Sequence, residues 1–136
     1  MTKATGRCLC GAVSYEAEIP DRPVYAGLCH CRDCQRYTGS AFGESLMVPK
    51  AGVTLKGELR FYATPTERGS TMERGFCPVC GSGVLCRSPA WEDQYVLAAG
   101  TLDDPGIFRP RINLFTRSAQ SHVWHLDELR KAETNP

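Results

Sequence analysis

Apolar and polar residues alternate in short stretches along most of the chain, with little sign of a helical period. In residues 12–18 (AVSYEAE), Val13, Tyr15 and Ala17 fall on one face of an extended chain, which predicts a half-buried strand. Glycine and proline separate this stretch from similar ones farther along. The further strand-like stretches are residues 41–48, 53–62, 71–77, 83–87, 94–100 and 111–116. The pattern therefore predicts a mainly β fold of many short strands.

Helical patterns are confined to two places. Apolar residues recur at helical spacing in residues 124–133, and one turn of helix is expected directly after Cys31. The chain shows no internal repeat, low-complexity tract or linker, and its 136 residues suit one domain. We therefore expect a single domain over residues 1–130 and a loose tail over residues 131–136.

Composition excludes several classes of protein. Hydrophobic residues make up 42% and charged residues 23% of the chain, which is typical of a globular domain. The net charge of +1 and the absence of a lysine–arginine block give no reason to expect nucleic-acid binding. The apolar runs are too short to cross a membrane, and no apolar region of a secretory signal follows the charged start. We therefore expect a cytoplasmic protein.

The chain has eight cysteines, which are many for its length. In a reducing compartment they are expected to be metal ligands or redox groups rather than disulfides. Their even number would also suit a secreted disulfide framework, but they are clustered and no signal is present. Their spacing is therefore the main evidence for function.

Two pairs of cysteines have the spacing of zinc knuckles. The sequence is Cys-x-Cys-Gly at residues 8–11 and Cys-x2-Cys-Gly at residues 77–81. Glycine accepts a positive φ without strain, so each turn can aim backbone N–H groups at the sulfurs. Zinc takes four ligands in a tetrahedron. The spacing predicts a closed structural zinc site at Cys8, Cys10, Cys77 and Cys80. The alternative is that one pair is redox-active, or is buried without metal.

Three further cysteines, Cys29, Cys31 and Cys34, lie close together. Cys86 stands alone on a predicted strand, where a cysteine usually behaves as a small buried apolar residue. His30 lies between two cysteines, and three adjacent side chains are not expected to face one metal, so we place His30 beside the site or on the surface. The three cysteines are therefore predicted to hold a zinc with an open fourth position, the mark of a catalytic or substrate-binding zinc.

The type of ligand indicates the chemistry of this second site. Three thiolates give a zinc site a net charge of −1 and donate strongly, so the metal is a weaker Lewis acid than one held by three histidines. Holding a substrate thiol as a nucleophilic thiolate is then a better use of the site than activating water. The alternative is that an unrecognised protein group closes the site and both zincs only brace a small fold.

Four other residues are candidates for a functional role. Gln35 and Arg36 follow the three-cysteine group, and the planar fork of Arg36 suits a carboxylate if the segment turns helically. We take both as candidate substrate-binding residues, with a surface position of Arg36 as the alternative. His122 and His125 have i, i+3 spacing but lack further metal ligands, so surface or capping roles are expected. One of them could act as a general base if the C-terminus folds over the zinc.

Several motifs together resemble those of a known family. They are GRCLCGAVSYE (6–16), CHCRDCQRYTGS (29–40), FCPVCGS (76–82), GTLDDP (100–105) and a P-x-x-N…W pattern (110–124). In this order, and over nearly the whole chain, they resemble the glutathione-dependent formaldehyde-activating enzyme family. Centromere protein V carries the same domain. The chain departs from the family pattern at Asn113, where family members often have histidine.

The resemblance implies both a fold and an activity. The fold would be a β-tent of two small antiparallel sheets, with a structural zinc at the four-cysteine group and a catalytic zinc at Cys29, Cys31 and Cys34, hence two zinc ions per chain. The activity would be that of a carbon–sulfur lyase, in which glutathione adds to formaldehyde and gives S-hydroxymethylglutathione. The implied partners are a small-molecule thiol and an aldehyde. Basic side chains would hold the carboxylates of glutathione.

Three other functions compete with this enzyme. The first is a non-catalytic two-zinc binding module. The second is a zinc deaminase, which we set aside because Arg32 occupies the place of the required glutamate and Pro78 follows its cysteine instead of preceding it. The third is a redox enzyme with Cys86 as its reactive thiol, as in methionine sulfoxide reductases of related fold.

Overall fold

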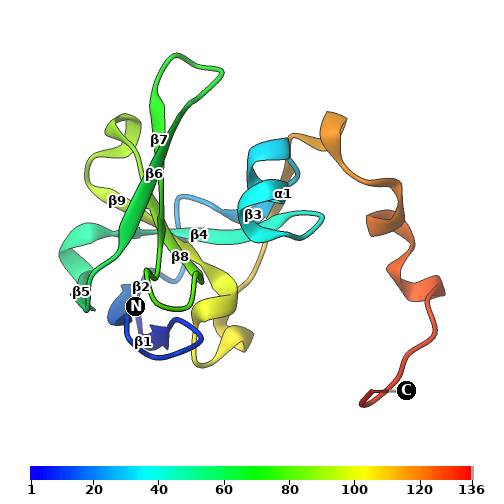
Figure 1. Cartoon of the computed structure of the whole chain (residues 1–136), viewed down its shortest axis with the longest axis horizontal. Coiled ribbons are helices and arrows are strands. Elements are labelled where there is room, and N and C mark those ends of the chain that lie inside the picture. The colour runs from blue at the N-terminus through cyan, green and yellow to red at the C-terminus, as the bar shows by residue number, and fades with distance from the viewer. Residues whose placement is uncertain (136) are drawn as a thin grey trace.

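The computed structural model of the protein describes residues 1–135, and its strands form two sheets (Figure 1). The smaller sheet has the strand order β1-β2-β5, and the larger has the order β10-β3-β4-β9-β8-β7-β6. The strands are β1 (Thr2–Arg7), β2 (Ser14–Ile19), β3 (Ala26–Cys29), β4 (Gly43–Pro49), β5 (Val53–Lys56), β6 (Arg60–Pro65), β7 (Thr71–Phe76), β8 (Gly83–Arg87), β9 (Gln94–Ala98) and β10 (Ile112–Leu114). The predicted mainly β, two-sheet architecture is confirmed. Within residues 1–135 the named strands pair antiparallel, except that β10 runs parallel to β3.

The helix that was expected after Cys31 is present as α1 (Arg32–Thr38). Cys31 is its N-cap residue, with extended backbone angles, and Gly39 ends it in the left-handed region at φ 66°. Short 3-10 segments connect other strands in the described part of the chain. They are Lys50–Gly52, Pro89–Trp91, Ala99–Thr101, Pro105–Ile107, Thr116–Ser118 and Ser121–Glu128.

The observed strands differ from the prediction in one strand that is split and in two strands that were not expected. The single strand expected over residues 53–62 is two strands, β5 and β6, which belong to different sheets. Gly57 lies between them with φ 88°, a conformation that breaks a strand and suits glycine. Strands β1 and β3 were not predicted. β1 buries only Ala4 and Gly6, so the sequence there shows no apolar alternation.

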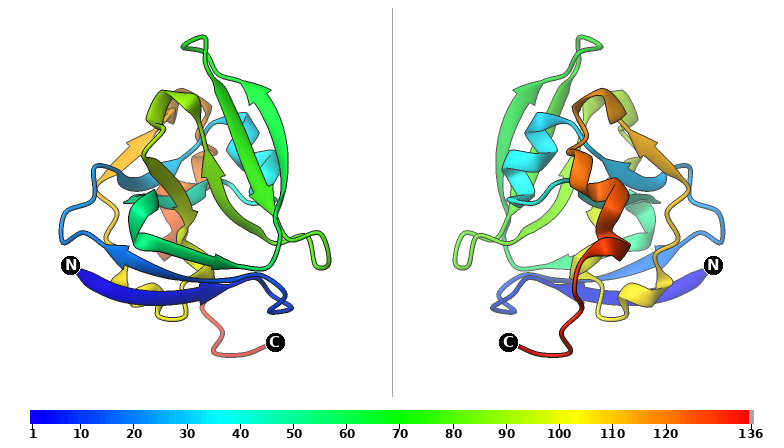
Figure 2. Two further views of the ribbon diagram at one scale, coloured as in Figure 1. Left: turned by 90° about the vertical axis from the view of Figure 1, so that its left-hand side faces the viewer. Right: turned by 90° about the vertical axis from the view of Figure 1, so that its right-hand side faces the viewer.

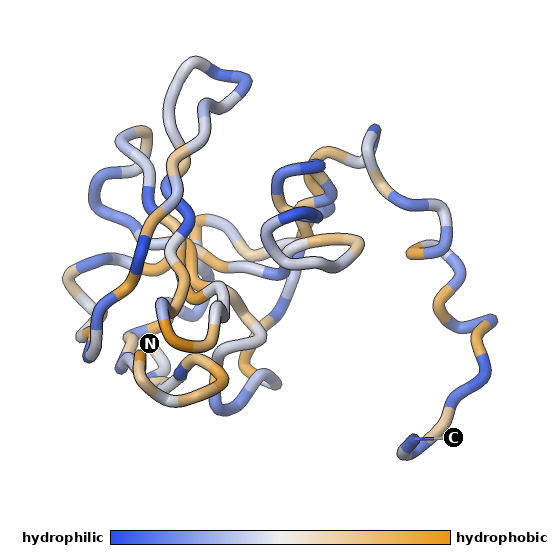
Figure 3. The backbone as a smooth tube through the Cα atoms, viewed as in Figure 1, coloured by the Kyte–Doolittle hydropathy of each residue, from blue (hydrophilic) through white to orange (hydrophobic). Residues whose placement is uncertain are grey.

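The core draws side chains from both sheets. β2 contributes Tyr15, Ala17 and Ile19, which are each at most 4% exposed and confirm the predicted alternation. The larger sheet contributes buried aliphatic side chains, and Figure 3 shows hydrophobic colour along these central strands and hydrophilic colour in many outer turns. The fully buried aliphatic residues of the larger sheet are Leu46, Val48, Val84, Leu85 and Leu97.

The prediction of a helix over residues 124–133 is wrong. The structure has a 3-10 segment at Ser121–Glu128, interrupted by a non-helical backbone at His125, and residues 129–135 form no helix. Trp124, Leu126 and Leu129 are 51%, 49% and 60% exposed, so no buried apolar face stabilises a longer helix. This segment runs along the outside of the molecule on the side of α1 (Figure 2).

Two other expectations concern the tail of the chain and segments that could cross a membrane. Residues 131–135 of the predicted tail form neither helix nor strand, and Pro136 lies outside the described residues. Over the described part of the chain, every helix is too short or too polar to traverse a lipid bilayer.

The turn at Gly57 gives a test of the boundary between the sheets. An ideal Cβ at Gly57 would lie 2.2 Å from the Ala12 carbonyl oxygen, whereas one at Gly69, which has φ 80°, would meet nothing within 4 Å. We expect Gly57→Ala to lower the free energy of unfolding by more than about 3 kcal/mol, since strain and a steric clash add. Gly69→Ala should cost only about 1–2 kcal/mol, from strain alone. Denaturant unfolding of the zinc-loaded variants measures both, and equal losses would contradict this account.

Candidate functional site

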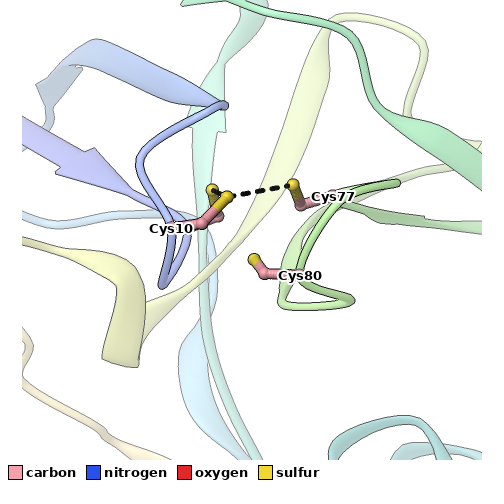
Figure 4. Close-up of side chains that lie close together, drawn as sticks. Cys10, Cys77 and Cys80 are labelled. Carbon is pink, nitrogen blue, oxygen red and sulfur yellow. Dashed lines mark hydrogen bonds between the residues drawn. The ribbon is translucent and has the colours of Figure 1, made fainter.

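The first cysteine cluster joins two turns that are distant in the sequence. Cys8 and Cys10 lie between β1 and β2, and Cys77 and Cys80 lie between β7 and β8. The four Sγ atoms lie within 4.8 Å of one another, with 3.7 Å between Cys8 and Cys10 and 3.8 Å between Cys10 and Cys77 (Figure 4). Sulfurs at about 2.3 Å from a tetrahedral metal are about 3.8 Å apart. The cluster therefore fits zinc and could hold it in the closed site predicted from the spacing.

The backbone of the first turn is shaped around the sulfurs. Gly11 has φ 83°, in the left-handed region that a glycine adopts without strain. Beyond it, the N–H of Ala12 donates to Cys10 Sγ at 3.4 Å, and the N–H of Val13 donates to Cys8 Sγ at 3.3 Å. These hydrogen bonds favour the thiolate forms, which are the forms that bind metal.

Ser82 links the two turns of the four-cysteine cluster. Its Oγ accepts from the N–H of Leu9 at 3.0 Å and lies 3.2 Å from Cys80 Sγ. The hydrogen bond from Ser82 lowers the pKa of the Cys80 thiol to about 5. The same hydroxyl therefore holds the turns together and prepares a sulfur ligand.

The second cysteine cluster is built from one short segment. Cys29 ends β3, Cys31 caps α1, and Cys34 lies in the first turn of that helix. Their three Sγ atoms lie within 4.8 Å of one another, and the N–H of Cys34 donates to Cys31 Sγ at 3.3 Å. β4 packs closely against them, since a Cβ at Gly43 would lie 3.8 Å from Cys34 Sγ. The strand end and the helix start thus aim three thiols at one point, as the spacing predicted.

The three sulfurs are close enough to share protons. Hydrogen bonds from Cys29 and Cys34 lower the pKa of Cys31, and the same contact with Cys31 raises the pKa of Cys29. The ionisation of one thiol therefore opposes that of its neighbours. A divalent cation would allow all three sulfurs to ionise. This donor set fits zinc, which prefers thiolates.

No fourth ligand of the usual kinds closes this cluster in residues 1–135. In this cluster only the side chains of Cys29, Cys31 and Cys34 bring ligand atoms within 4.8 Å of one another. No other Cys, His, Asp or Glu of the described residues joins them, whereas the first cluster has four ligand atoms. All three cysteines are partly exposed. The second cluster therefore differs from the first in offering three sulfur ligands where the first offers four.

Comparison with known protein families agrees with this pair of clusters. The model of the family described as "Glutathione-dependent formaldehyde-activating enzyme" (GFA) matches residues 3–118. The chain belongs to the GFA family. The matched region includes both cysteine clusters, Cys86 and the described strands, except for Thr2 at the start of β1. A search of curated proteins finds no match.

A crystal structure of a Rhodobacter sphaeroides protein, a structural-genomics target, has the same fold as this GFA-family chain. The two chains share 21% sequence identity with a TM-score of 0.61, and the likeness covers 81% of this chain and 98% of that one. At this identity the likeness supports the fold alone.

His30 is buried, so the surface position that the sequence analysis allowed for it is wrong. It is 1% exposed, and its Nε2 shares a 2.8 Å hydrogen bond with Oδ1 of Asn113. Its ring centroid lies 5.3 Å from that of Phe42 and 5.5 Å from that of Trp124. His30 therefore lies beside the three-cysteine cluster and contacts the C-terminal segment.

Gln35 is 6% exposed and is engaged by protein groups on both ends of its amide. Its Nε2 donates to the carbonyls of His30 at 2.8 Å and Ser118 at 3.0 Å. Its Oε1 accepts from Arg32 and, at 3.4 Å, from Gln120. These bonds anchor the C-terminal segment to α1. Substrate binding by Gln35 stays a prediction, and a substrate would have to compete with these bonds.

Arg36 and the two C-terminal histidines are exposed. Within the described residues Arg36 forms no ion pair, so its guanidinium is available, and its substrate role stays a prediction. His125 Nδ1 lies 3.3 Å from Glu128 Oε1, and neither His122 nor His125 joins a metal-ligand cluster in residues 1–135.

Two residues near the three-cysteine cluster were missed by sequence reasoning. Tyr37 on α1 donates from its hydroxyl to the Gly75 carbonyl at 2.5 Å, which ties the helix to β7. Arg74 on β7 is 9% exposed and carries its charge toward α1. No local pattern indicates either contact, because each joins residues more than 30 positions apart.

The two clusters are expected to respond differently to loss of one ligand. Cys77→Ser should remove the metal that joins the two turns and leave the chain largely unfolded, because binding and folding are coupled there. Cys34→Ser should lose the other metal and keep the fold. Zinc per chain together with circular dichroism measures both results. Unfolding of Cys34→Ser to the same extent as Cys77→Ser would show that the three-cysteine cluster is structural.

Cys86 is expected to be a poor nucleophile near neutral pH. Burial raises the pKa of its thiol to about 11, so little thiolate is present at neutrality. Its rate of alkylation by iodoacetamide in the zinc-loaded protein should rise about tenfold per pH unit until the pH approaches the pKa. Mass spectrometry of labelled Cys86, with denatured protein as the control, measures this rate. Labelling that is already maximal near neutrality would instead support the redox function.

Proposed function

We propose that this chain is a zinc-dependent carbon–sulfur lyase-type enzyme that acts on an adduct of a thiol and a small aldehyde. In this proposal the thiol is glutathione or a similar molecule and the aldehyde is formaldehyde or one of similar size. Membership of the GFA family supports the reaction class. The contrast between a four-cysteine cluster and a three-cysteine cluster supports the location of the active site.

The observation that carries the proposal is the incomplete three-cysteine cluster. Cys29, Cys31 and Cys34 could hold a zinc ion and leave one position for a thiol, with the four-cysteine cluster holding a second, structural zinc. Zinc in the three-cysteine site supplies a Lewis-acid position that favours the thiolate form of a substrate thiol. The protein contributes three fixed sulfurs and a restricted space beside them.

The proposed reaction balances without a further reactant. In the forward direction the thiol sulfur forms a bond to the aldehyde carbon, the carbonyl π bond breaks toward oxygen, and that oxygen takes the proton released by the thiol. In the reverse direction the carbon–sulfur bond breaks and the same proton returns to sulfur. The role of the protein is to hold the sulfur ionised and oriented, which removes the entropic cost of bringing the reactants together.

The surroundings of the cluster offer places for the rest of the substrate. A pocket of about 430 Å³ borders α1 and β4; its wall includes Thr38 of α1 and Phe42 and Glu44, the neighbours of Gly43 in the sequence, but none of the three cysteines. The remaining lining residues are Tyr37, Ser40, Gly81, Ser82, Gly83, Ala98, Gly100 and Thr101. Arg36, exposed on the last turn of α1, is the proposed partner of a substrate carboxylate.

A glutathione titration of the cobalt-substituted protein tests the proposal. Cobalt reports each bound sulfur through charge-transfer absorption, and an open site predicts a saturable new sulfur band. S-methylglutathione, which lacks a free thiol, should give no band, and Cys34→Ser should lose the response. Consumption of formaldehyde in the presence of glutathione, followed by NMR, then measures the reaction itself.

The alternatives give different results in the same experiments. A site that holds cobalt but shows no spectral change at millimolar glutathione would favour the non-catalytic two-zinc module. A sulfur band without formaldehyde consumption would favour a thiol-binding protein or another aldehyde. Only the band together with turnover supports the enzyme as proposed.

A further inference from the structure

Arg74 is a buried cation that faces the helix of the three-cysteine cluster. It lies on β7, is 9% exposed, and donates from Nη1 to Thr64 Oγ1 of the neighbouring strand β6 at 2.7 Å. Its Cζ is 6.0 Å from the centroid of the Tyr37 ring on α1. The Tyr37 hydroxyl in turn donates to the Gly75 carbonyl at 2.5 Å. The guanidinium is thus fixed between the β6–β7 hairpin and α1.

Arg74 faces the side of α1 that carries Cys34, because Cys34 and Tyr37 are three residues apart on this helix and lie on one face. Burial lowers the pKa of Arg74, but the charges of Cys34, Cys86 and Asp33 and a hydrogen bond with Cys34 together raise it above its ordinary value. The guanidinium is therefore placed to stabilise negative charge on the sulfur cluster.

The charge of the occupied site explains why a buried cation is useful there. Three thiolates around a divalent metal leave a net charge of −1, and an anionic fourth ligand would make it −2. Charges that are removed from water interact strongly and need a partner. Arginine remains charged at any pH a protein tolerates, so it offers a permanent counter-charge.

We propose that Arg74 is a positioning residue of the three-cysteine site, whose guanidinium offsets the negative charge of Cys29, Cys31 and Cys34. It would thereby strengthen metal retention and favour an anionic fourth ligand over a neutral one. The first effect depends only on metal binding by the cluster. The second rests on the proposed function, since it requires the fourth position to be open.

A purely structural role for Arg74 is the alternative, because its bond to Thr64 also braces the β6–β7 hairpin. Arg87 provides a matched control. It lies on the adjacent strand β8, pairs with Glu73 at 2.9 Å, and packs over the Phe61 ring with Cζ at 3.7 Å from its centroid. Replacing Arg87 removes the same charge from the same sheet without removing the cation beside Cys34.

The first experiment measures metal retention by competition with a coloured zinc chelator. We expect Arg74→Gln to weaken the zinc that Cys34→Ser also loses by about 10- to 100-fold, the usual effect of losing a group that supports metal ligands. Arg74→Lys keeps the charge and should restore most of the affinity, while Arg87→Gln should match the wild type. The zinc of the four-cysteine cluster should be retained in all these variants, which reports that the fold is intact.

The second experiment measures the choice of fourth ligand in the cobalt-substituted protein. Azide serves as the anionic probe and imidazole as the neutral one, each titrated by its visible spectrum. Arg74→Gln should bind azide about tenfold more weakly relative to imidazole, as expected when one partly buried counter-charge is lost. Thr64→Val keeps the charge but removes a hydrogen bond, so it should change this ratio less than Arg74→Gln.

The outcomes separate this inference from the proposed function. If Arg74→Gln retains zinc as the wild type does, or if Arg74→Lys loses as much affinity as Arg74→Gln, the charge role is overturned. If Arg74→Gln fails to fold, Arg74→Lys and Thr64→Val decide the question by the same comparison. If the wild-type cobalt protein binds neither azide, imidazole nor a thiol, the open site of the proposed function fails, and zinc competition alone still decides the role of Arg74.

Discussion

The meeting of four sulfurs from two distant turns is the constraint on which the rest of the structure depends. Cys8 and Cys77 are 1% and 0% exposed and belong to the core, so the cluster is part of the packing that joins the two sheets. Four thiols held this closely cannot all ionise without a cation between them. Metal binding and the joining of the β1–β2 turn to the β7–β8 turn are therefore one event.

The three-cysteine cluster depends on this frame but is built differently. Its ligands come from one strand end and the helix that follows, so the segment aims them locally. The frame contributes what the segment lacks: Gly43 of β4 gives the sulfurs space, and β7 reaches α1 through Tyr37 and Gly75. Anchoring of the C-terminal segment by Gln35 and His30 covers the other side of α1. Within the described residues, no distant element brings a fourth Cys, His, Asp or Glu ligand to this cluster.

Local spacing was enough to predict both clusters, because a knuckle and its glycine fix several ligands within a few residues. The strand β2 was predictable for a similar reason, since its alternation matches the one buried face. Spacing could not reveal the split at Gly57, where a close approach to the Ala12 carbonyl decides the backbone. It also misjudged residues 124–133, whose apolar side chains stay about half exposed and bury no continuous apolar face.

Contacts between distant residues account for the rest of what the sequence did not show. His30 was placed only by elimination, and its burial depends on Phe42 and Trp124, which no local pattern connects. The engagement of the Gln35 amide depends in part on the Ser118 carbonyl and the Gln120 side chain, which the C-terminal segment supplies. Arg74 has no feature in the sequence that separates it from the fifteen other basic residues among the sixteen Lys and Arg of the chain. Only its burial on β7, facing α1, distinguishes it from the other basic residues.

The two clusters share one kind of donor but would carry different charges with a metal bound. Four thiolates around zinc carry a net charge of −2, and the protein offsets it with N–H donors from Ala12 and Val13 and with the Ser82 hydroxyl. A substrate thiolate would bring the three-cysteine site to the same charge. With a substrate thiolate bound, the three-cysteine site would therefore have the same four sulfur ligands and the same charge as the four-cysteine site. In the first site the ligand that completes it is fixed in the chain, so turns can be shaped around it. In the proposed function the fourth ligand of the second site enters and leaves, so the compensating charge would have to be present in the protein before that ligand arrives.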